Sequence, residues 1–237
     1  MKYLIFFSLL LISVSSYSQT LKLDLSLPQP RLGQSFYITF SSDTISKQIF
    51  NLPQGKFKIN NYSNSTSTET SFSVNIEALK TGENELGPLT FTFNGNTYKT
   101  DVIKFMVADS LPRVDKGVWI RKVPIDDTSV YIIIDQRIPT HPTITQKDKN
   151  TISMSAEVNN DEKETTLKIE DVENAKIEER YTSSETVPNF FGDKLSYGLY
   201  YKCYRVTLLD KKKPLVLTSA AFENLPGYYK FQSIKIN

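Results

Sequence analysis

The sequence has little of the chemistry that enzymes use. Among 237 residues it contains one cysteine, Cys203, and one histidine, His141. A single cysteine excludes an intramolecular disulfide. One residue of each type also cannot supply the three or four ligands of a histidine and cysteine zinc site. The nine glycines form neither GxGxxG nor GxxxxGK, so no phosphate-binding loop is present. We therefore expect no cofactor.

A thiol nucleophile with an imidazole base is the sharpest enzymatic hypothesis that this composition permits. It would pair Cys203 with His141, but no glycine elbow or other local motif accompanies either residue. His141 stands in PTHP, which is typical of a loop, and Cys203 stands in the strand-like run YYKCY. We predict an exposed histidine, a cysteine buried in a core, and no catalytic residue.

The charge is almost balanced. The chain has 28 basic and 26 acidic residues, which leaves no basic field to attract nucleic acid. Two acidic segments could supply oxygen ligands to calcium: Asp126-Asp127 and residues 159–162 (NNDE). Neither has the ligand spacing and the glycine of a calcium-binding loop, so we interpret both as solvated turns and predict no metal site.

The N-terminus has the order of regions that defines a secretion signal. Lys2 supplies the positive charge, an uncharged apolar run follows as far as Ile12, and Ser16 and Ser18 are small. The apolar run is shorter than the roughly 20 residues that span a bilayer. We predict a cleaved signal peptide at residues 1–18. Since no cysteine lies near the cleavage site and no later segment reaches membrane-spanning length, we expect a periplasmic or secreted chain without its own membrane span.

Strand patterns dominate the rest of the chain. Residues 71–78 alternate polar and apolar, and residues 152–158 repeat the pattern, which places one apolar face of each strand on a core. Asn-Gly inside residues 89–99 predicts a tight hairpin. The apolar runs 36–40 and 130–134 are typical of central strands buried on both faces. These features predict an all-β fold.

The length suits two domains of immunoglobulin-like β-sandwich type. A change of pattern at residues 110–116 (SLPRVDK) predicts a linker, with one sandwich at residues 19–109 and a second, diverged one at residues 117–237. The second domain is longer, chiefly through polar segments around residues 140–149 and 185–196, which we predict to be surface loops. Three sequence matches in the same order indicate a duplication. The first pairs Leu27-Pro28 and the strand run 36–40 with Val123-Pro124 and the strand run 130–134. The others pair residues 52–57 (LPQGKF) with 172–177 (VENAKI), and residues 98–105 (YKTDVIKF) with 229–236 (YKFQSIKI).

The aromatic residues allow two interpretations. Thirteen tyrosines and Trp119 could form an exposed platform for glycans or for a protein partner, although most such residues pack in cores and cross-strand pairs. Two N-glycosylation patterns, at Asn61 and Asn64, indicate a polar surface strand or loop.

Three short motifs of the first predicted domain occur together in a known family. Gly33-Gln34 precedes an apolar strand, Lys80-Thr81-Gly82 precedes the hairpin, and residues 95–98 (GNTY) lead into a closing strand. With these motifs, residues 20–108 resemble the N-terminal region of BatD, the oxygen-tolerance protein family, whereas residues 117–237 resemble it only weakly. The resemblance implies an envelope protein of immunoglobulin-like repeats with membrane-bound partners that bear von Willebrand factor A domains. It supplies no catalytic residues. Family members commonly continue into a C-terminal transmembrane helix, whereas this sequence stops at Asn237.

Three functional hypotheses follow. The first is a non-catalytic protein-binding or scaffolding module of the bacterial cell envelope, linked through the resemblance to stress or oxygen tolerance. The second is a surface glycan-binding module, for which the tyrosines are the motive. The third is a hydrolase with an unrecognised site.

Overall fold

The structure is a computed structural model, and it describes residues 20–41, 57–66, 70–93, 96–146, 152–158, 161–169, 172–187 and 195–237. The predicted signal peptide lies outside these residues. Strands make up most of the described chain, and the one helix among the described residues is the short 3-10 helix Ser219–Ala221. The predicted all-β fold is therefore confirmed. No described helix has the length and apolar character to cross a bilayer. The chain divides into two compact units, Met1–Leu111 and Pro112–Asn237.

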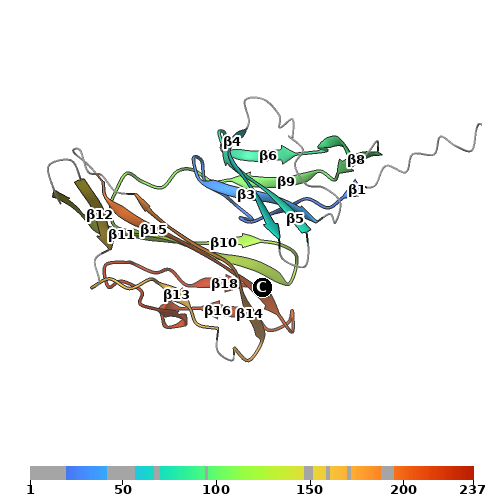
Figure 1. Cartoon of the computed structure of the whole chain (residues 1–237). Coiled ribbons are helices and arrows are strands. Elements are labelled where there is room, and N and C mark those ends of the chain that lie inside the picture. The colour runs from blue at the N-terminus through green and yellow to red at the C-terminus, as the bar shows by residue number, and fades with distance from the viewer. Residues whose placement is uncertain are drawn as a thin grey trace, which may run out of the picture. The chain divides into compact units, whose positions relative to one another are not determined.

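The first unit consists of three small sheets (Figure 1). Their orders are β2-β3-β5-β4, β6-β9 and β1-β8-β7. The hairpin predicted around Asn-Gly is confirmed, since β7 and β8 pair antiparallel from Thr90 with Lys99 to Phe93 with Asn96, and the two turn residues lie outside the described chain. The strands are β1 (Thr20–Leu21), β2 (Asp24–Leu25), β3 (Ser35–Ser41), β4 (Phe57–Thr66), β5 (Thr70–Ala78), β6 (Gly82–Leu86), β7 (Thr90–Phe93), β8 (Asn96–Thr100) and β9 (Ile103–Val107).

The core of the first unit lies between these sheets. Phe36 of β3 and Phe105 of β9 meet edge to face with their ring centres 5.9 Å apart, which joins the four-stranded sheet to the β6-β9 pair. Ile38, Ile76 and Ala78 are fully buried beside them. In the part of this strand whose side chains are described, residues 75–78, the apolar residues are the buried ones, as predicted. The unit is a sandwich of facing layers.

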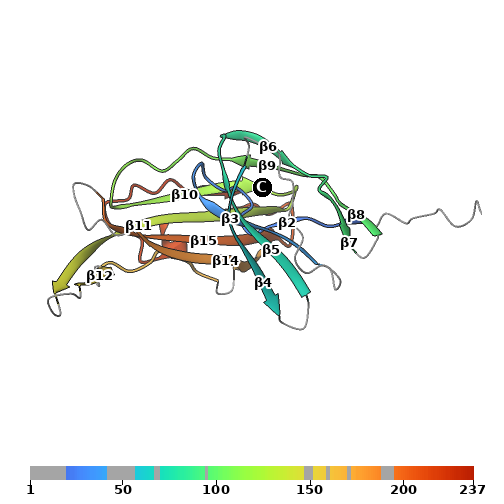
Figure 2. The same cartoon turned by 45° about the horizontal axis from the view of Figure 1, so that its top comes forward.

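The second unit is built on one long twisted sheet. Its order is β10-β11-β15-β14, and Figure 2 shows these strands side by side. β12 pairs with the C-terminal half of β11, and the pairs β13-β17 and β16-β18 form smaller sheets. The strands are β10 (Gly117–Pro124), β11 (Ser129–Gln146), β12 (Ile152–Val158), β13 (Thr166–Leu167), β14 (Ala175–Val187), β15 (Tyr197–Leu208), β16 (Leu215–Leu217), β17 (Phe222–Glu223) and β18 (Ile234–Ile236).

The core of the second unit joins the long sheet to the smaller ones. Ile132, Ile134 and Val206 of the long sheet belong to one cluster with Phe222 of β17 and Ile236 of β18. Val130, Ile132, Ile133 and Ile134 are all buried, so the prediction of a central strand buried on both faces is confirmed for residues 130–134.

The two units repeat one strand order. The sheet β2-β3-β5-β4 and the sheet β10-β11-β15-β14 both place the fourth strand in chain order between the second and the third. A β-bulge interrupts β4 between Ile59 and Asn61, and another interrupts β14 between Glu179 and Tyr181, 120 positions later. The same offset aligns residues 52–57 with 172–177 in the sequence.

The closing strands repeat as well. β9 pairs with β6 through Ile103 and Leu86, and β18 pairs with β16 through Ile234 and Leu217, each 131 positions later. Burial also repeats, because the strand residue two positions after the isoleucine is buried in both units. This offset is the one that aligns residues 98–105 with 229–236.

The polar segments predicted to be loops are wrong in part. Residues Thr140–Gln146 continue β11 and pair antiparallel with β12, and Glu185–Val187 continue β14. Among the described strands, β11 pairs with β15 up to Pro139 and with β12 from Thr140 onward. Pro139 and Pro142 are tolerated because only one edge of β11 has a strand partner at these two positions. Pairing with β12 thus satisfies the backbone groups on one edge of this part of β11.

Candidate functional site

The structure separates the single thiol from the single imidazole. His141 is an exposed strand residue of β11 rather than the loop residue predicted from PTHP. Cys203 of β15 lies opposite Ile133 of β11, eight residues before His141. At about 3.3 Å per residue, the two side chains are roughly 26 Å apart along β11. They cannot act on one substrate atom.

Cys203 is a core residue, as predicted. It is fully buried in the sheet, and desolvation by this burial raises the pKa of its thiol to about 12. Because the thiolate is the reactive form, the thiol stays protonated and unreactive near neutral pH.

Asp126 holds the turn between β10 and β11. Its Oδ1 accepts hydrogen bonds from the backbone N–H groups of Thr128 and Ser129, each at 2.8 Å, and from the Thr128 hydroxyl at 2.9 Å. These bonds lower the pKa of the Asp126 carboxyl. In the described part of the chain no three acidic, histidine or cysteine residues gather as metal ligands. Of the second calcium candidate, Asn159 and Asn160 lie outside the described residues.

A pocket of about 390 Å³ opens at one end of the second unit. Its walls come from two segments that the β13-β17 pair brings together. Asn224 donates from its amide to the carbonyl of Glu164 at 3.1 Å, and the Thr165 hydroxyl donates to the Asn224 carbonyl at 3.2 Å. The walls are therefore tied to each other before any ligand arrives. The lining residues are Lys116, Asp161, Glu162, Lys163, Asn224, Leu225, Pro226, Gly227 and Tyr228.

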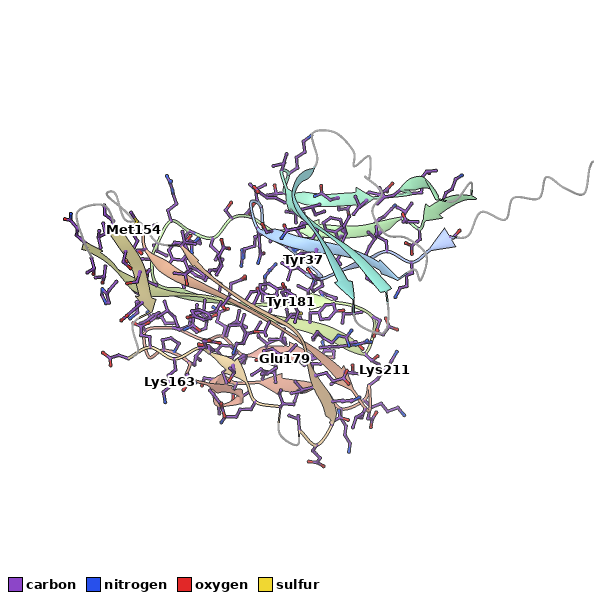
Figure 3. All side chains as sticks on the ribbon, viewed as in Figure 1. Tyr37, Met154, Lys163, Glu179, Tyr181 and Lys211 are labelled. Atoms are coloured by element: carbon purple, nitrogen blue, oxygen red, sulfur yellow. The ribbon has the colours of Figure 1, made fainter. Side chains whose placement is uncertain are left out.

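A buried glutamine anchors the first of these walls to the long sheet. Gln136 of β11 accepts from the backbone N–H of Thr165 at 2.6 Å and donates to the carbonyl of Lys163 at 3.2 Å. Its side chain is 1% exposed, so neither of its bonds competes with bulk water. Figure 3 labels Lys163 at this end of the unit.

The pocket combines both signs of charge with an aromatic ring. Lys116 forms an ion pair with Glu162, and its Nζ lies 4.9 Å from the centre of the Tyr228 ring. The hydrogen bond to Glu162 raises the pKa of Lys116. The other carboxylate oxygen of Glu162, Oε2, is buried and accepts no hydrogen bond. Unpaired buried acceptors are rare, and this one belongs to a residue that lines the pocket.

Exposed apolar side chains gather on the hairpin of β11 and β12. Ile144 and Met154 lie opposite each other and are 49% and 43% exposed, and Ile152 on the same face is 59% exposed. The prediction that the alternating residues 152–158 place their apolar face on a core is therefore wrong. The alternation does form a strand, but this strand pairs only with β11 among the described strands, and its apolar face stays accessible to solvent.

These features define a class: an all-β protein of sandwich units that offers a preformed pocket and an exposed hairpin, with no catalytic arrangement among its described residues. Residues 24–107 match the family model described as "BatD DUF11 like domain", so the resemblance of the first unit to this family is confirmed. The match runs from β2 to the end of β9. No curated protein and no solved structure matches the chain.

Two of the motifs behind the resemblance have a structural reason. Gly33 and Gly82 adopt φ angles of 77° and 86°, a region that residues with a side chain rarely occupy. Gln34, next to Gly33, accepts a hydrogen bond from the backbone N–H of Arg31 and closes the same turn at 2.9 Å. The motifs thus specify backbone geometry of the domain and no chemistry.

Proposed function

We propose that this chain is a non-catalytic, exported module of the bacterial cell envelope that binds and scaffolds other envelope proteins. The match of its first unit to the BatD-like domain is the observation that supports this role. The family resemblance suggests membrane-anchored partners with von Willebrand factor A domains and a contribution to stress or oxygen tolerance. The N-terminal pattern suggests that the chain acts in the periplasm or outside the cell.

Crosslinking in intact cells, followed by pull-down of the tagged chain, tests this proposal. We expect an envelope protein to be recovered in the crosslinked sample and to be absent from cells that lack the chain. Recovery of no protein partner would overturn the scaffold role. Cell fractionation and mass spectrometry of the N-terminus test the location, since removal of the predicted signal peptide at residues 1–18 leaves a mature chain that begins at Gln19.

The pocket of the second unit supports glycan binding as a second candidate function. Hydroxyl groups of a saccharide could donate to the carboxylate of Glu162 and accept from Lys116, while Tyr228, 48% exposed, supplies an aromatic surface. A glycan array probed with the wild type and with Glu162→Gln tests this function. Glu157→Gln, on exposed β12 outside the pocket, is the control. An array without any binder removes the candidate.

The hydrolase hypothesis gains no support from the described residues. The pocket lining does not include His141 or Cys203. Its two acids, Asp161 and Glu162, are neighbours in the chain, and Glu162 is already paired with Lys116.

A further inference from the structure

The outer edge of β12 is unprotected. Among the described strands β12 pairs with β11 alone, so its second row of backbone N–H and C=O groups faces no strand. Such an edge is a template for pairing with another chain, and proteins usually block it with lysine, proline or a bulge. Residues 152–158 (ISMSAEV) contain no lysine, arginine or proline, their pairing with β11 has no bulge, and Glu157 is their only charge.

The other edges of the same sheet are protected. Besides β10 and β14, the edge of β11 opposite β12 carries Pro142. β14 carries the bulge between Glu179 and Tyr181, and its charges include Lys176 and Glu178 (Figure 3 labels Glu179 and Tyr181). β10 carries Lys122 and ends in a proline. The contrast identifies β12 as the place where this sheet is open to extension.

The side chains of the β11-β12 hairpin also restrict the sequence of a strand that could pair with β12. Figures 1 and 2 show β12 continuing alongside the end of β11, beyond β10. One face of the hairpin bears the exposed Ile144, Ile152 and Met154, and the other bears Ser153, Ser155 and Glu157. An added strand must therefore alternate apolar and small polar residues and must place no acid opposite Glu157.

β12 itself meets these requirements. In an antiparallel pair of two β12 strands centred on Ser155, Ile152 lies opposite Val158 of the second copy, and Met154 lies opposite Ala156. Glu157 lies opposite the hydroxyl of Ser153, so the two glutamates sit at opposite ends of the pair. Every apolar residue faces an apolar residue, and no like charges meet.

We propose that two copies of this chain associate through antiparallel pairing of their β12 strands about a twofold axis at Ser155. Pairing satisfies the open backbone edge of both copies and turns two marginal hairpins into one four-stranded sheet. Met154 and Ala156 of opposite copies cover part of each other across the new strand pair. This self-association is separate from the binding of envelope partners proposed above.

Site-specific crosslinking of the exported full chain tests the geometry. The buried Cys203 gives a low background, so single cysteines can be introduced at Ser155, at Ser153 and, as a control, at the exposed Thr182 on β14. With a short bis-maleimide, Ser155→Cys should form a covalent dimer most efficiently. Ser153→Cys should react less, because the two copies of residue 153 are four residues out of register, about 13 Å along the strand. Equal dimer yields from Ser155→Cys and Thr182→Cys would overturn the proposal.

Sedimentation of the unlabelled chain supplies the second test. The wild type should reach twice the mass of one chain at micromolar concentration, and Ser155→Lys, which places two cations at the axis, should weaken association at least tenfold. Thr182→Lys should leave it unchanged. A monomeric wild type at all concentrations, or a dimer that Ser155→Lys leaves intact, would overturn the proposal. A heterotypic crosslink from Ser155→Cys to a cysteine of another protein, in place of the dimer, would show a different partner strand and would also overturn the proposal.

Discussion

Replacing Gln136 with leucine should destabilise the second unit strongly. The side chain is buried, and its two hydrogen bonds, at 2.6 Å to the N–H of Thr165 and 3.2 Å to the carbonyl of Lys163, hold a strand-free segment against the sheet. Leucine has a similar size but leaves both backbone groups without this partner. Each unsatisfied buried group costs about 1–3 kcal/mol, so we expect the two groups together to lower the free energy of unfolding by about 2–6 kcal/mol.

The fluorescence of the single tryptophan measures the unfolding of the second unit. Trp119 lies in β10, so its fluorescence during urea unfolding follows the second unit. With a slope of about 2 kcal/mol per molar urea, the midpoint should fall by about 1–3 M. Gln146→Leu is the matched control, because Gln146 is an exposed residue of the same strand and should shift the midpoint little. If Gln136→Leu and Gln146→Leu gave the same midpoint, the two hydrogen bonds of Gln136 would not contribute to stability.

Three further outcomes are expected. Cys203 should resist alkylation in the folded chain at pH 8 and react in urea, and stability should decline as the pH rises above 9, because only the unfolded thiol then ionises. Gly87→Ala would place a Cβ 2.3 Å from a backbone carbonyl oxygen at a residue whose φ is 96°. Calorimetry should therefore show a loss of about 2 kcal/mol or more in the free energy of unfolding. Gly227→Ala, whose Cβ would have no atom within 4 Å, should change it little. Because the folded pKa of Asp126 is lowered, stability should fall as the pH drops below about 4, and less so in Asp126→Asn.

Local patterns predicted the strands well because each strand needs only its own residues to show a period of two. The run at residues 130–134 and the hairpin at residues 89–99 are both present where the sequence placed them. The same periodicity failed for the burial of β12. A period of two tells which face of a strand is apolar, but a second layer must cover that face before it becomes a core, and the alternation of residues 152–158 contains no information about such a layer.

The pocket could not be predicted for a different reason. Glu162 and Tyr228 are 66 positions apart, and Lys116 is 46 positions before Glu162. Glu162 and Tyr228 are brought together by the pairing of the two-residue strands β13 and β17, and strands of that length leave no periodic pattern in a sequence. A spacing motif does not exist for a site of this kind.

The repeated bulge explains where the second unit gained its own surfaces. A bulge shifts strand register by one residue, and a one-residue slip would move every side chain to the other face, so the bulge must persist while the core diverges. In both units the bulge lies in the strand that is third along the chain, β4 or β14, but the connection that precedes this strand differs in length. It covers residues 42–56 in the first unit and residues 147–174 in the second. The longer connection contains β12 and the pocket residues Asp161, Glu162 and Lys163. The shared framework therefore accounts for the BatD-like fold, and the open edge and part of the pocket come from the longer connection between β11 and β14.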